Sequence, residues 1–109
     1  MRLVAIVALL AACTGAPADT AGPPCETATS WNNFADGFFA SYCRACHSAS
    51  TPERYGAPPG LDFDTEEQVR TYETAIRRSV LEYGTMPPGG GLPDEDRLLL
   101  TEWLDCSGS

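Results

Sequence analysis

Cys43-Arg44-Ala45-Cys46-His47 is a C-x-x-C-H segment, and it constrains the interpretation of this chain more than any other stretch. Two cysteines at this spacing, followed directly by a histidine, form the attachment pattern of c-type haem. A helical turn ending at the second cysteine would place both sulfurs at one edge of the planar ring and the imidazole beneath it. The segment therefore predicts one covalently bound haem c, attached at Cys43 and Cys46, with His47 as an iron ligand.

Two other chemistries use paired cysteines. A thiol redox pair of the C-x-x-C kind normally follows a strand in a βαβ unit, and nothing in this sequence resembles such a unit. A structural zinc site would need further thiolates, so Cys25 and Cys106 would have to gather at the same point. Both stay open as alternatives, but neither gives a role to the methionine of the mature chain.

The second axial ligand of the haem iron is predicted from the few histidines and methionines in the sequence. The chain has one histidine and two methionines, of which Met1 belongs to the N-terminal signal and Met86 remains. Met86 lies in the loop YGTMPPGGG (83–91), where prolines fix φ and glycines permit tight turns. A lone methionine often only fills a core, but a loop of this kind suits the presentation of one side chain. We therefore predict that Met86 is the second iron ligand.

The N-terminus predicts export. A positive start at Arg2 is followed by uncharged, mostly apolar residues up to Ala12, which is the layout of a signal peptide. This run is shorter than the about 20 residues that span a bilayer. The residues Leu10-Ala11-Ala12-Cys13 resemble a bacterial lipobox, so residues 1–12 would be removed and Cys13 would carry the lipid. Ordinary signal cleavage is the alternative.

Residues 13–24 are rich in Pro, Gly, Ala and Thr and cannot bury enough surface to fold alone. We expect them to form a flexible tether between lipidated Cys13 and a domain over residues 25–109. Several acyl chains on one cysteine would anchor the protein durably to a membrane. The expected location is the bacterial cell envelope, facing the periplasm or the outer surface.

Composition narrows the class of protein further. A content of 43% hydrophobic residues among 109, with ten Gly and nine Pro, fits one small globular domain with much irregular loop. Seven basic residues, all arginine, face fifteen acidic ones, for a net charge of −8. This sign argues against nucleic acid as a partner. The acidic excess either steers a basic protein partner or serves solubility.

Two cysteines remain once lipid and haem are assigned. Cys25 and Cys106 flank the predicted domain, and an exported protein would be expected to join them in a disulfide. Such a bridge would close a loop of about 80 residues and stabilise the fold by about 4 kcal/mol in the chain-entropy model. Two free thiols are the alternative.

Apolar spacing predicts three helical regions. Residues 30–44 have apolar side chains at helical intervals, with Ser30 as a cap. Residues 64–80 begin with the capping-box spacing of Asp64 and Glu67 and are expected to break near Glu73. The last helix opens near Pro93, has acidic residues in its first turn and carries an apolar stripe. The stripe consists of Leu99, Leu100, Trp103 and Leu104.

These features together resemble the small monohaem cytochromes c with His and Met axial ligands, over about residues 25 to 107. The resemblance rests on CRACH (43–47), the MPP loop (86–88) and a final helix ending in WLDC (103–106), and GAPPGLDF (56–63) resembles a bacterial subset. It implies an all-α, cytochrome c-like fold in which three to five short helices and long Gly/Pro loops surround one haem.

The resemblance also implies contacts. In the family, an aromatic residue four positions before the first haem cysteine meets the last helix, which would pair Phe39 with Trp103, and Ala35 holds the place of a small residue. A carbonyl of a proline loop accepts a hydrogen bond from the ligand imidazole, which places Pro58 or Pro59 near His47. Arg54, Arg77 and Arg78 would either pair with haem propionates or remain solvated, and none is singled out.

The function implied is that of a single-electron carrier, not an enzyme, with redox proteins as partners. A sensor or peroxidase-like haem protein in which Met86 dissociates is one alternative. A haem-free surface lipoprotein that binds other proteins is another.

Overall fold

The computed structural model describes residues 25, 26 and 28–106. The predicted signal (1–12), the whole predicted tether with Cys13 (13–24) and the last three residues of the chain lie outside this part. All regular structure in the described ranges is helical, which confirms the all-α class. None of the helices described there is long and apolar enough to cross a membrane.

The N-terminal helical segment consists of η2 (Trp31–Ala35), a π-helical stretch, and α1 (Asp36–Tyr42). Ser30 caps it as predicted: its hydroxyl accepts from the Asn33 amide, and the Asn33 side chain accepts from the Ser30 amide. The helix ends at Cys43, whose amide still donates to the Phe39 carbonyl. The C-x-x-C-H motif therefore begins where the segment stops.

The middle region contains α2 (Glu66–Thr71), α3 (Glu73–Ile76) and η3 (Arg77–Glu82). The predicted break near Glu73 is confirmed, because α2 ends before Tyr72. The predicted capping pair, Asp64 with Glu67, is wrong by one residue. Thr65 and Gln68 form the capping box, while the Asp64 carboxylate turns back to accept from the Ala49 amide at 2.9 Å.

The C-terminal helix α4 (Asp94–Cys106) starts directly after Pro93, whose carbonyl accepts from the Arg97 amide. Its first turn carries three acidic residues, which are favourable at the positive end of the helix dipole. Of the predicted apolar stripe, three side chains are fully buried and Leu99 is partly buried. The three are Leu100, Trp103 and Leu104.

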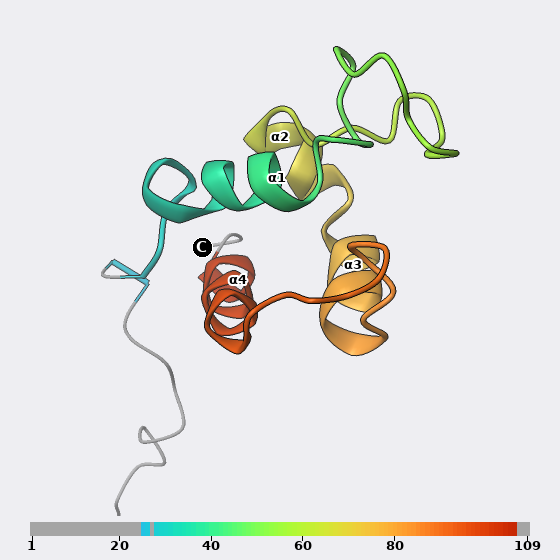
Figure 1. The fold of residues 1–109 in the computed structure, drawn as a ribbon. Coiled ribbons are helices and arrows are strands. Elements are labelled where there is room, and N and C mark those ends of the chain that lie inside the picture. Colours follow the sequence, from blue (N-terminus) through green and yellow to red (C-terminus); the bar gives the residue numbers. More distant parts are fainter. Residues whose placement is uncertain (1–24, 27, 107–109) are drawn as a thin grey trace, which may run out of the picture.

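The core forms where α4 packs against the N-terminal segment and η3 (Figure 1). Phe39 is fully buried and meets Trp103 edge-on, with ring centroids 6.2 Å apart. Ala35 is also fully buried and belongs to the same core. Both placements agree with the expected crossing of the first and last helices. The remaining buried apolar residues are Phe38, Phe63, Val69, Ile76, Val80, Leu100 and Leu104.

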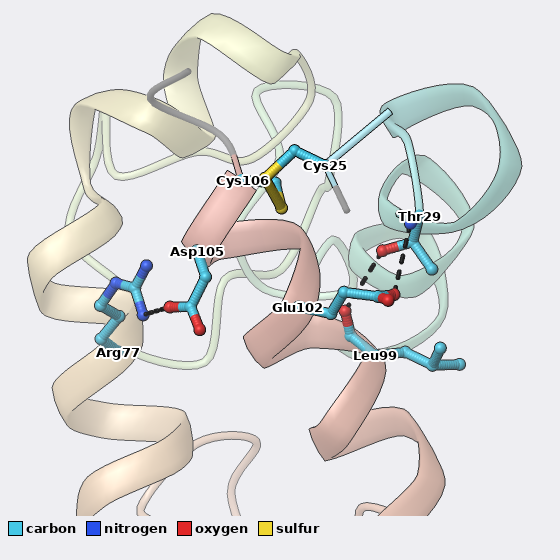
Figure 2. The surroundings of a disulfide bond; sticks show 7 residues. All are labelled: Cys25, Thr29, Arg77, Leu99, Glu102, Asp105 and Cys106. Carbon is cyan, nitrogen blue, oxygen red and sulfur yellow. Dashed lines mark hydrogen bonds and ion pairs between the residues drawn. A yellow bond between two sulfur atoms is a disulfide. The ribbon is translucent and has the colours of Figure 1, made fainter. Parts of the chain in front are cut away.

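A disulfide joins Cys25 to Cys106, as predicted, with Cα atoms 5.4 Å apart across 81 positions of sequence. Figure 2 shows that hydrogen bonds support this end of the molecule: the Thr29 amide donates to Glu102 at 3.3 Å, and the Thr29 hydroxyl donates to the Leu99 carbonyl at 3.4 Å. The segment preceding η2 is therefore fastened to α4 by covalent and polar contacts.

Candidate haem site

One cavity of about 280 Å³ brings the predicted site residues together. Cys43, Cys46 and His47 line it from the turn after α1, and Met86 lines it from the loop after η3. His47 and Met86 therefore line the same cavity. Apolar side chains make up much of the remaining wall, among them Phe39, Tyr42, Leu61, Phe63, Ala75, Ile76, Val80, Pro87 and Pro88.

The motif turn is compact. The His47 amide donates to the Cys43 carbonyl at 2.9 Å, and the Cys46 amide donates to the same carbonyl at 3.2 Å. These bonds close one helical turn over the five motif residues, and both thiols and the imidazole contribute to the wall of one cavity. This is the arrangement that the C-x-x-C-H spacing predicts.

A backbone carbonyl fixes the His47 ring. Its Nδ1 lies 2.8 Å from the Leu61 carbonyl oxygen, and because a carbonyl only accepts, Nδ1 carries the proton and Nε2 is left with a free lone pair. The Phe63 ring packs on the imidazole at a centroid distance of 4.9 Å. The tautomer and the ring orientation suit a metal ligand.

The resemblance places Pro58 or Pro59 near this imidazole without naming the carbonyl that accepts; Pro58 lines the same cavity as His47, and the accepting carbonyl is that of Leu61. The Pro58 carbonyl instead accepts from the Leu61 amide at 3.1 Å and closes a turn. Gly60, at the third position of that turn, has a φ of +88°, which favours glycine in a type II turn with proline before it. The turn brings the Leu61 carbonyl to His47.

Phe63 and Arg44 clamp this loop to the motif, and the sequence interpretation assigned neither role. The Phe63 amide donates to the His47 carbonyl at 2.9 Å, and Arg44 Nε donates to the Phe63 carbonyl at 2.7 Å. Arg44 also pairs with Asp36 at 2.6 Å. The stretch 56–63 was recognised in the sequence, but its contacts depend on a fold that no local pattern encodes.

The Met86 loop is fastened at its start. The Met86 amide donates to the Ser79 carbonyl at 3.1 Å, and the Thr85 hydroxyl donates to the same carbonyl at 3.3 Å. From α4, the Arg97 guanidinium donates to the carbonyls of Val80 and Leu81 at 3.2 and 3.1 Å. The Met86 side chain remains 39% exposed, so the loop backbone is held while the thioether stays accessible.

The state of the cysteines weakens the alternatives to haem. Burial raises the pKa of the Cys43 thiol to about 12, whereas reactive redox thiols have a lowered pKa. For a zinc site, Cys25 and Cys106 would be the further ligands, but each is held in the disulfide. Among the described residues, no group of three or more Cys, His, Asp and Glu side chains gathers around one point.

The donor set fits a covalently attached haem. Two unpaired thiols, an imidazole with a free Nε2 and a thioether contribute to one cavity whose other walls are largely apolar. No family model, curated protein or solved structure matches this chain. The residues and their contacts therefore carry the functional argument.

Proposed function

We propose that this protein is a single-electron carrier with a cytochrome c-like fold and one covalent haem c. Cys43 and Cys46 would form the thioether bonds, and His47 and Met86 would be the axial ligands. The observation that supports this most strongly is that all four side chains line one cavity. Bound haem would supply one-electron redox chemistry at its iron.

The chain's own residues would hold this group in one geometry. The Leu61 carbonyl keeps the His47 proton on Nδ1, and the bonds to Ser79 hold the backbone of the Met86 loop. The largely apolar wall would favour the reduced state of a bound haem and raise its potential. A site held rigidly on both sides suits electron transfer better than substrate chemistry.

The proposed setting is the bacterial cell envelope, with a lipid on Cys13 as the membrane anchor and redox proteins as partners. The supporting observations are the sequence of residues 1–24 and the disulfide between Cys25 and Cys106, a bond typical of exported proteins. The net charge of −8 would favour encounter with basic surfaces.

The direct test is a haem stain of the protein after denaturing electrophoresis. The full chain, exported in a bacterial host that attaches haem c, is expected to keep a coloured, covalently bound group. The variant C43A/C46A is expected to lose the stain, whereas C25S/C106S should retain it as a control for the loss of two other cysteines. A colourless wild-type protein would rule out the proposal.

Because Met86 is partly exposed, the sensor or peroxidase-like alternative, in which Met86 dissociates, also requires a test. We expect the absorption band typical of methionine-ligated ferric haem in the wild type and its loss in M86A. In an electron carrier the band persists when a small ligand such as imidazole is added at moderate concentration. Its disappearance under those conditions would favour the alternative in which Met86 dissociates.

A further inference from the structure

Among the described residues, Arg54 is the one arginine that lines the cavity, and its contacts all lie in the loop beside His47. Nη1 donates to the Ser48 carbonyl at 2.8 Å, Nε to the Ala57 carbonyl at 3.2 Å and Nη2 to the Pro58 carbonyl at 2.8 Å. One guanidinium therefore ties together the two ends of the loop that follows the motif.

The same guanidinium reaches the acceptor of the imidazole. Arg54 Nη2 lies 3.4 Å from the Leu61 carbonyl oxygen, which is the atom that accepts from His47 Nδ1. A carbonyl oxygen has two lone pairs and can serve both donors. Because Arg54 also binds the Pro58 carbonyl, it contacts both ends of the turn that presents Leu61.

Asp62 completes the arrangement. Its Oδ1 forms an ion pair with Arg54 Nη2 at 2.7 Å but lacks hydrogen-bond geometry, and only 9% of its side chain is exposed. A buried carboxylate needs a partner, because an unpaired buried charge is strongly destabilising. Asp62 follows Leu61 directly in the chain, so the ion pair restrains the backbone next to the carbonyl that His47 uses. Lysine could supply the charge but not the planar fork of donors.

We propose that Arg54 is a positioning residue for His47: paired with buried Asp62, it holds the Leu61 carbonyl at the Nδ1 proton of the imidazole. Its consequence for the haem iron rests on the proposed function, whereas the contact itself does not. The pair also keeps the site electrically balanced, because the cation beside the imidazole is matched by an anion.

The test follows the Nδ1 proton of His47 by nuclear magnetic resonance. The sequence contains one histidine, so ¹⁵N-histidine labelling of the full chain yields a single imidazole. In the wild type the Nδ1 proton is expected to exchange slowly with solvent. In R54K and D62N we expect exchange to be faster by about tenfold or more, since the acceptor is held less firmly.

R78Q is the matched control, because Arg78 is an exposed arginine with no contact to this loop among the described residues; it should exchange within about twofold of the wild type. Circular dichroism would establish that each variant is folded, and D62N, which keeps the volume of Asp62, serves if the Arg54 variant does not fold. Wild-type exchange rates in folded R54K or D62N would overturn the proposal.

The reduction potential of the haem-loaded protein is a second measurement. A purely structural role of Arg54 and Asp62 would leave this potential unchanged. D62N leaves the Arg54 cation unmatched and is expected to shift the potential upward, because a nearby positive charge disfavours the ferric state. R54Q/D62N removes both charges and should return toward the wild-type value. An unchanged potential in D62N would contradict the electrostatic part. A missing haem stain would refute the proposed function alone, since the exchange measurement needs only the imidazole.

Discussion

At the scale of single residues, Asp64 has a different role from the helix cap that the sequence predicted. Its carboxylate accepts from the Ala49 amide at 2.9 Å, and hydrogen bonds from Ser48 and Ala49 lower its pKa below the ordinary value of 3.8. The contact joins the residues that follow His47 to the start of α2. A carboxylate in this position stabilises the fold only while it is ionised.

The expected pH dependence follows from that sign. With a folded-state pKa below 3.8, the contribution of Asp64 is fully present above the unfolded value and disappears as the pH falls through the folded value. D64N should therefore lower the free energy of unfolding at pH 7 by about 1 kcal/mol or less. Near pH 2 its effect should vanish. Urea titrations at both pH values measure this, and an equal loss at both would show that ionisation is irrelevant.

At the scale of elements, the register of the caps is a local property that a sequence approximates only to within a residue. Ser30 was identified correctly because it directly precedes Trp31, the first residue of the apolar pattern. Asp64 and Thr65 are adjacent, both can cap, and each has a suitable residue three positions later. In the structure, the Asp64 carboxylate accepts a hydrogen bond from the Ala49 amide, which is distant in sequence. Thr65 therefore caps α2.

This assignment predicts a contrast between two substitutions. T65A removes the side-chain acceptor of the Gln68 amide and should destabilise the protein by about 1 kcal/mol. T65S keeps the acceptor and should restore most of that loss. E67Q, at the position first expected to complete the cap, should change the unfolding midpoint little. A larger effect for E67Q than for T65A would restore the original assignment.

The contact between α4 and η3 supports the Met86 loop. Arg97 supplies donors to the last carbonyls of η3, groups that a helix end leaves without partners of its own. R97Q should cost about 1–3 kcal/mol in denaturant unfolding. It should also weaken the methionine-ligated absorption band if that band is present. R78Q again serves as a control, and an R97Q protein as stable as R78Q would exclude a supporting role for these bonds.

At the scale of the whole molecule, the sequence predicted the helical class, the three helical regions, the crossing of Phe39 with Trp103 and the disulfide. The helical regions depend on periodicity and the disulfide on a small inventory of residues, whereas the meeting of Phe39 with Trp103 was implied by the resemblance to the cytochromes c. The sequence placed the proline loop near His47 but did not identify the accepting carbonyl, which is that of Leu61. The contacts of Arg44, Arg54 and Arg97 were not predicted, because each joins segments whose approach is set by packing of the complete chain.

The disulfide is the largest single contribution to stability that we expect at this scale. The Cys25–Cys106 bond spans 81 positions of sequence, and its loss in C25S/C106S should lower the free energy of unfolding by about 4 kcal/mol. Denaturant unfolding of the wild type with and without a reductant provides the comparison. A reductant that shifts the midpoint of C25S/C106S as strongly as that of the wild type would assign its effect to another group.

The disulfide also determines how mechanical force would be transmitted through the protein. The disulfide joins Cys25 to Cys106 at the end of α4. Tension applied to the chain before Cys25 would therefore pass through this bond directly to α4. The turn containing CRACH lies inside the bridged span and is bypassed by that route. Drag on a protein attached by its N-terminus would therefore strain the periphery, while the cavity lined by His47 and Met86 keeps its shape.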